Sequence, residues 1–235
     1  MPCLPADRVA RAGLGALLAL LGACATPGVP VATVAHWRMA PDALRDPPLE
    51  RYLDQRLAAI APAGPAAASV LVRAPGLRAE WREPGAVLLS TDLLLRVVDD
   101  DELAFLLAHE LGHARLGHVA SASGPGMPDP ALERQADRWA RDRIAAMGQR
   151  DDAGVTLLQA LATELAGDPE RAPVRDAIEA RLAAMRALPT ARAPPDPAPA
   201  GEWLALQRAR REAWAARDPG LRDPGRAALV RARWR

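Results

Sequence analysis

Five consecutive residues have the types and the spacing of a metal-dependent hydrolytic site. They are His109-Glu110-Leu111-Gly112-His113. Four residues of α-helix turn about 400°, so the two imidazoles project from one face and can bind a single ion. Glu110 lies about 100° round from His109, where its carboxylate can take a proton from a water that the ion activates. The pentapeptide therefore predicts zinc bound by His109 and His113, with Glu110 as the general base.

A catalytic zinc needs a third protein ligand and one open position. The next carboxylates along the chain are those of Asp129, Glu133 and Asp137. Asp129 precedes a proline and is expected to cap a helix. Glu133 and Asp137 share a face of that helix, and a chain reversal over 124–127 permits Glu133 to return to the metal. Asp137 would then accept the free ring N–H of a ligating histidine.

Each of these residues also has a structural alternative. His109 and His113 could be satisfied within a buried helix face, although an unpaired pair of histidines with a carboxylate is costly there. Glu133 could simply complement the dipole of the first helical turn. For His118 we expect closure of the helix C-terminus in preference to metal binding.

The elements that position these residues are mostly helical. Asp99 and Glu102 have the spacing of a capping box, which predicts a helix from 99 to about 118. A second helix is expected after Asp129, with Pro130 at its first position, ending near Met147. Further helical patterns cover 49–60, 153–166, 171–187 and 201–217. Short apolar runs at 69–73 and 86–90, with a possible third at 77–81, predict a small sheet.

Composition argues against a nucleic-acid partner. The chain has 30 basic and 29 acidic side chains, for a formal net charge of +1. Such a balance gives no long-range field to gather nucleic acid. Aromatic residues make up only 3% of the chain, so the core must consist mainly of Leu, Val and Ala.

The N-terminus has the form of a lipoprotein signal. Basic residues precede an apolar run that is too short to span a bilayer, and the run ends in Leu-Gly-Ala-Cys at Cys24. The four-residue box resembles the bacterial lipobox, which implies cleavage after residue 23 and lipidation of Cys24. Ala25 in place of Asp favours the periplasmic face of the outer membrane. A lipidated mature chain then has no free thiol, so histidine and carboxylate must hold any metal.

The expected organisation is a signal peptide over 1–23, a membrane tether over 24–48, a zinc metallopeptidase domain over 49–188, and a linker, helix and loose tail over 189–235. The expected fold class is α+β, a mostly helical zincin-type domain with a small sheet beside the HExxH helix.

Two segments of the sequence, taken together, resemble a known family. The stretch TDLLLRVVDDDELAFLLAHELGHARLGH, followed by ERQAD, is similar to the HtpX-like and CAAX-prenyl-protease-like zinc endopeptidases of the gluzincin group. The resemblance covers about 70–185 and implies one zinc per chain. It implies His109, His113 and Glu133 as ligands, Glu110 as the base and Asp137 as the orienting residue.

The function we expect is that of a lipid-anchored metalloendopeptidase acting on bacterial envelope proteins, in quality control. An exposed strand near 86–90 would hold the substrate extended. Arg175 and Arg181 are candidates for stabilising the oxyanion. Two alternatives stay open: a metal-binding chaperone or assembly lipoprotein with little activity, and a zinc hydrolase acting on a cell-wall amide. The sequence does not indicate an oligomeric state.

Overall fold

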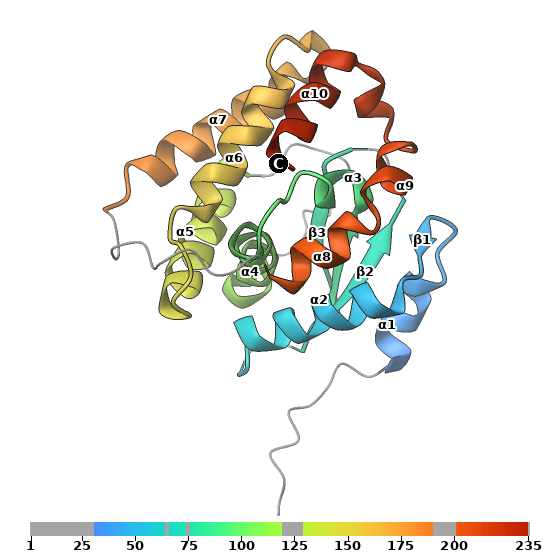
Figure 1. Ribbon diagram of the computed structural model, residues 1–235. Coiled ribbons are helices and arrows are strands. Elements are labelled where there is room, and N and C mark those ends of the chain that lie inside the picture. Colours follow the sequence, from blue (N-terminus) through green and yellow to red (C-terminus); the bar gives the residue numbers. More distant parts are fainter. Residues whose placement is uncertain (1–30, 64–65, 74–75, 119–128, 190–200, 235) are drawn as a thin grey trace, which may run out of the picture.

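A four-stranded mixed sheet lies beside the helix that carries His109 and His113 (Figure 1). The computed structural model describes residues 31–63, 66–73, 76–118, 129–189 and 201–234. The strands follow the order β1-β2-β4-β3, in which β2 and β4 are parallel and both outer pairs are antiparallel. Their bounds are β1 (Ala43–Leu44), β2 (Ala68–Val72), β3 (Ala79–Arg82) and β4 (Ala86–Ser90).

The two central strands are apolar runs covered on both faces. Val70 pairs with Leu88, and every residue of β4 is buried. Such continuous apolar strands are typical of parallel pairs that lie between other layers. The predicted strands at 69–73, 77–81 and 86–90 are therefore confirmed within about two residues at each end.

Helices make up most of the remaining structure. They are α1 (Val31–Arg38), α2 (Pro47–Ile60), α3 (Thr91–Leu94), α4 (Asp100–Leu116), α5 (Pro130–Ala146), α6 (Ala153–Leu165), α7 (Ala172–Arg186), α8 (Glu202–Arg208), α9 (Arg211–Ala215) and α10 (Pro224–Arg233), with 3-10 turns η1 (Pro169–Arg171) and η2 (Pro219–Arg222). Helix α4 lies between the sheet and the group formed by α5, α6 and α7 (Figure 1). The predicted α+β class, mostly helical with a small sheet, is confirmed.

Local sequence signals explain where α4 begins and ends. The Asp99 side chain accepts a hydrogen bond of 2.7 Å from the backbone N–H of Glu102, as expected of an N-cap. At the other end Gly117 has a φ of +69°, a left-handed conformation that ends many helices. Between these caps, the whole stretch from Glu102 to Gly112 is buried. Helix α4 is thus the central helix of the core.

The expected tether over 24–48 is too long. Residues from Val31 onward fold against the domain as α1 and β1, and Val34 is buried in a small cluster with Val70 and Leu88. The sequence shows no periodicity here because α1 has only eight residues and β1 only two. The signal at 1–23 and Cys24 lie outside the described residues.

The expectation of a loose C-terminal tail is wrong. The helix predicted over 201–217 is divided into α8 and α9, and the residues after it form η2 and α10. Trp203 is fully buried, and its indole N–H donates to the carbonyl of Val97 at 3.0 Å. The indole of Trp234 likewise donates to Leu95 at 2.9 Å. These tryptophans anchor the segment to the connection between α3 and α4, which a local pattern does not reveal.

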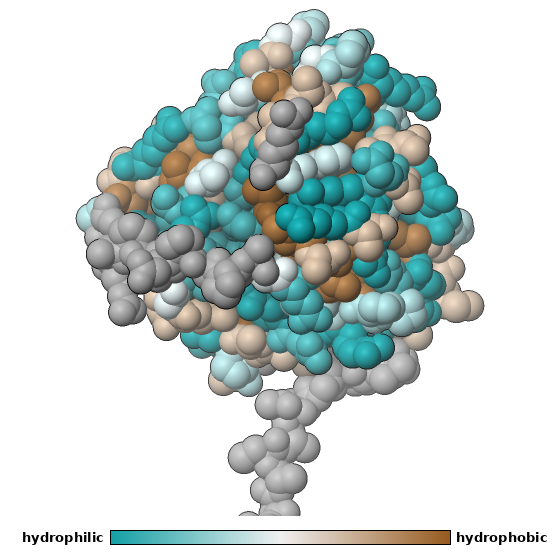
Figure 2. Space-filling model, viewed as in Figure 1, coloured by the Kyte–Doolittle hydropathy of each residue, from teal (hydrophilic) through white to brown (hydrophobic). Residues whose placement is uncertain are grey.

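The visible surface is polar over most of its area. Figure 2 shows hydrophilic side chains over this face, with apolar residues in small separate groups. Within the described residues, no helix is both long enough and apolar enough to cross a membrane.

Candidate metal centre

Close packing of α4 against α5 brings the candidate site residues together. Gly112 allows this approach, because a Cβ at that position would lie only 3.3 Å from the Cα and the carbonyl oxygen of Ala136. Asp129 caps α5 by accepting a bond of 2.7 Å from the N–H of Ala131, and Pro130 follows it, as the sequence predicts. The first two turns of α5 consequently face the histidines of α4.

Three side chains form a triangle of donor atoms. The Nε2 atoms of His109 and His113 are 3.1 Å apart. The carboxylate of Glu133 lies 3.3 Å from each of them, through Oε2 to His109 and through Oε1 to His113. These three residues form a group that could hold a metal ion.

The triangle fits zinc in size and in chemistry. Zinc binds imidazole nitrogen and carboxylate oxygen at about 2.0–2.2 Å, so two donors of a tetrahedral site are roughly 3.4 Å apart. The observed separations of 3.1, 3.3 and 3.3 Å are close to this value. Two histidines and one carboxylate leave a fourth position for water or substrate.

Asp137 and Arg181 contact the residues that form the triangle. The Nδ1 atom of His109 lies 2.9 Å from Oδ1 of Asp137, so this ring can donate there while Nε2 faces the donor cluster. Arg181, from α7, donates to both oxygens of Asp137 at 2.6 and 2.8 Å. Its Nη1 also lies 3.1 Å from Oε2 of Glu133. One guanidinium therefore fixes two carboxylates of the site.

Burial and charge together set the protonation of the cluster. Burial alone would raise the pKa of Glu133, but hydrogen bonds from His109 and His113 outweigh it and hold that pKa far below its usual range. The pKa of Asp137 falls to about 2, because the attraction of Arg181 exceeds the effect of burial. Burial and Arg181 oppose a charge on His109, yet bonds to Asp137 and Glu133 raise its pKa to about 9. Both carboxylates are therefore ionised at neutral pH, as metal binding requires.

Glu110 is held by the edge strand of the sheet. Its Oε2 accepts a hydrogen bond of 2.8 Å from the backbone N–H of Trp81 in β3. The side chain is buried, and burial raises the pKa of its carboxyl. Sequence reasoning did not foresee this contact, since Trp81 and Glu110 are 29 positions apart and only the sheet places them together.

The structure places the two arginine candidates in different surroundings. Arg181 lies in the cluster, where it is already engaged with Asp137 and Glu133. Arg175 pairs with Asp176 and Glu179 on the surface of α7. Of the two, only Arg181 is therefore placed near the candidate site.

His118 does more than close the helix. Its backbone N–H donates to the carbonyl of His113 at 2.9 Å, which completes the end of α4 as expected. Its ring also lies against the ring of His113, with the two Nδ1 atoms 3.1 Å apart. The spacing of the two histidines gave no signal of this ring contact, because it depends on the left-handed turn at Gly117.

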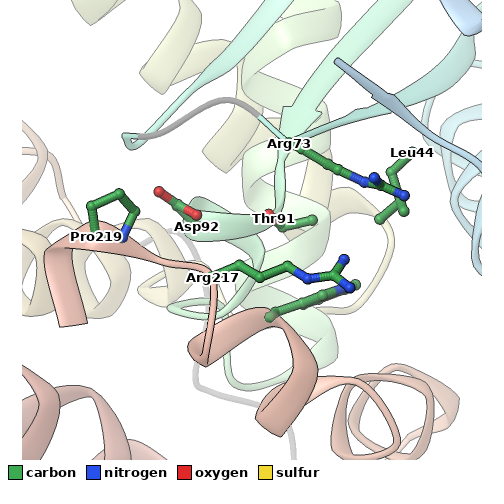
Figure 3. Close-up of a pocket in the computed structure, with 7 residues that line it drawn as sticks. Leu44, Arg73, Thr91, Asp92, Arg217 and Pro219 are labelled. Atoms are coloured by element: carbon green, nitrogen blue, oxygen red, sulfur yellow. The ribbon is translucent and has the colours of Figure 1, made fainter. Parts of the chain in front are cut away.

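A separate pocket lies where the C-terminal segment meets the sheet (Figure 3). Its volume is about 130 Å³, and it is lined by Leu44, Arg73, Thr91, Asp92, Trp214, Arg217 and Pro219. Burial raises the pKa of Asp92 in this pocket to about 6. None of the donor residues of the metal centre lines this pocket.

Comparison with known proteins agrees with the geometry. The family model of peptidase family M48 matches residues 55–127. The match includes His109, Glu110 and His113 but ends before Glu133 and Asp137. No curated protein matches this chain. The match indicates a metallopeptidase, in agreement with the His-His-Glu cluster.

Proposed function

We propose that this chain is a zinc-dependent metalloendopeptidase of the HtpX-like or CAAX-prenyl-protease-like type, binding one zinc ion through His109, His113 and Glu133. The observation that carries the proposal is the triangle of donor atoms with edges of 3.1 to 3.3 Å, on helices that also bring Glu110 beside it. The M48 match over 55–127 supports the hydrolytic class independently of these distances.

In the proposed mechanism zinc and Glu110 have separate roles. Zinc, when bound, polarises the scissile carbonyl and lowers the pKa of the attacking water. Glu110 takes the proton of that water and returns it to the leaving amine. The raised pKa of Glu110 suits this role, because a base works best when its pKa is nearer the working pH. The N–H of Trp81 holds Oε2, which leaves Oε1 for proton transfer.

The substrate strand belongs at β3, and not at 86–90 as the sequence suggested. Strand β4 lies between β2 and β3 and is buried throughout, so its edges are already paired. Among the strands of the described residues, β3 pairs only with β4. The carbonyl of Arg78 accepts from Ser90, so in an antiparallel pair Ala79 and Trp81 direct their backbone groups to the outer edge, where the N–H of Trp81 already donates to Oε2 of Glu110. An extended peptide added there would lie beside Glu110.

The envelope location and the substrates are further parts of the proposal. The basic N-terminus, apolar run and LGAC box favour lipidation at Cys24 and attachment to the periplasmic face of the outer membrane. Durable anchoring requires more than one acyl chain. Misfolded or misassembled envelope proteins are the substrates that we propose, with a role in quality control.

The test compares Glu110→Gln with the same substitution at exposed Glu170. Purified protein lacking residues 1–24 is assayed for zinc content and for degradation of unfolded casein. We expect about one zinc per chain in all three proteins. Hydrolysis should fall by more than about 100-fold in Glu110→Gln alone, the contribution of a general base.

Three results would contradict the proposal. Near-normal hydrolysis by Glu110→Gln would remove Glu110 as the base. Zinc binding without any hydrolysis by the wild-type chain would favour the alternative of a metal-binding chaperone or assembly lipoprotein. Activity on peptidoglycan fragments but not on casein would instead indicate an amidase.

A further inference from the structure

The two ligand histidines have different partners on the side away from the donor cluster. Nδ1 of His109 faces the carboxylate of Asp137 at 2.9 Å. Nδ1 of His113 faces Nδ1 of His118 at 3.1 Å, with the two rings nearly edge to face at 68°. His118 is not part of the His-His-Glu group. A second imidazole ring therefore stands behind His113 where a carboxylate stands behind His109.

The hydrogen-bond chain continues from His118 to helix α5. Nε2 of His118 lies 3.4 Å from Oε1 of Gln135. In the zinc-loaded chain Nε2 of His113 would bind the metal, so the neutral ring carries its proton on Nδ1 and donates it to Nδ1 of His118. His118 then accepts at Nδ1 and carries its own proton on Nε2, which faces Oε1 of Gln135.

This order of donors is the one that metal binding needs. With its proton on Nδ1, the neutral ring of His113 presents the lone pair of Nε2 to the donor triangle. The opposite order would protonate Nε2 and block it as a ligand. His118 thus accepts the proton of His113 on the side away from the metal and holds the orientation of that ring.

From this chain of hydrogen bonds we infer that His118 is a positioning residue, which holds His113 in the metal-binding tautomer and orientation without binding the metal. The inference rests on the proposed metal site and adds a residue to it. The backbone holds His118 in the required place, because Gly117 turns the chain back at the end of α4 and the N–H of His118 is anchored to the carbonyl of His113 at 2.9 Å.

The test separates a positioning role from a merely structural one. His118→Ala removes the acceptor, whereas His118→Asn keeps an oxygen near the position of Nδ1. Arg115→Ala, an exposed substitution in the last turn of α4, is the matched control. Zinc affinity is measured for each protein at one pH by competition with a chromophoric chelator. The protonated ring nitrogen of His113 is identified from two-bond ¹H–¹⁵N NMR correlations of the zinc-loaded chain.

We expect His118→Ala to bind zinc roughly 10- to 100-fold more weakly, the usual effect of losing the partner of a ligating histidine. His118→Asn should stay within about threefold of the wild type, as should Arg115→Ala. The wild-type spectrum should show the proton of His113 on Nδ1. If His118→Ala fails to fold, the spectrum of the wild type and the affinity of His118→Asn still decide the question.

Each contrary result is distinguishable. Unchanged zinc affinity in His118→Ala, or a proton on Nε2 of His113 in the loaded wild type, would overturn the inference. An Asn variant as weak as the Ala variant would also count against it. A wild-type chain that binds no zinc would instead defeat the proposed function.

Discussion

Removing the three carboxylates of α5 and its N-cap one at a time tests the ligand assignment directly. Glu133 lies 3.3 Å from both Nε2 atoms and supplies the third donor. Asp137 lies 2.9 Å from Nδ1 of His109, on the side of the ring away from the donor triangle. Asp129 is exposed, and its side chain accepts from the N–H of Ala131. The alanine variants should therefore rank in zinc affinity with Glu133 weakest, Asp137 intermediate and Asp129 nearly normal.

The magnitudes follow from what each side chain contacts. Loss of the bond that orients a ligand histidine costs roughly 10- to 100-fold in affinity, which is the range for Asp137→Ala. Loss of a direct ligand should exceed about 100-fold for Glu133→Ala, since both the donor and its charge are removed. Asp129→Ala removes a helix cap and should cost about 1 kcal/mol of stability with little change in affinity.

Asp137→Ala should also destabilise the metal-free chain. Asp137 is 1% exposed and accepts two bonds from Arg181. Removing one partner of a buried ion pair costs about 3–5 kcal/mol, and the partial exposure of Arg181 favours the lower end. Competitive zinc titration and urea unfolding measure the two effects separately. Weaker zinc binding by Asp137→Ala than by Glu133→Ala would move the ligand one turn along α5.

Three further predictions concern other parts of the chain. The pKa of Asp92 is raised from 3.8 to about 6, so its protonated form favours folding. Its contribution to stability is therefore complete below about pH 4 and is lost as the pH rises through 6, a difference of at most about 3 kcal/mol. Urea unfolding at several pH values measures this difference, and the substitution Asp92→Asn should abolish it. Trp203→Ala should lower the free energy of unfolding by about 3–5 kcal/mol, because the indole is fully buried; a change below about 1 kcal/mol would mean that the C-terminal segment is not part of the core. Cys24→Ser should abolish labelling by fatty acid in cells, and the lipoprotein prediction fails if the wild-type chain takes up no label.

The sequence by itself determined the local part of this protein. Helix α4 could be predicted because its signals are short-range: Asp99 caps its start, Gly117 ends it, and the spacing of His109 and His113 places both rings on one face. The cap at Asp129 follows from the same kind of signal. Such features depend on residues within a turn or two, whose conformation the chain decides locally.

Only the tertiary structure decided which distant groups meet at the site. Arg181 reaches Asp137 across 44 positions and Trp81 reaches Glu110 across 29, distances at which no helical or strand period relates two residues. The same holds for Trp203, which joins the C-terminal segment to Val97. These contacts depend on how helices and the sheet edge pack, and packing is set by the burial of the whole core. A local pattern therefore specifies α4 and its ligands, while the support behind them follows from the fold.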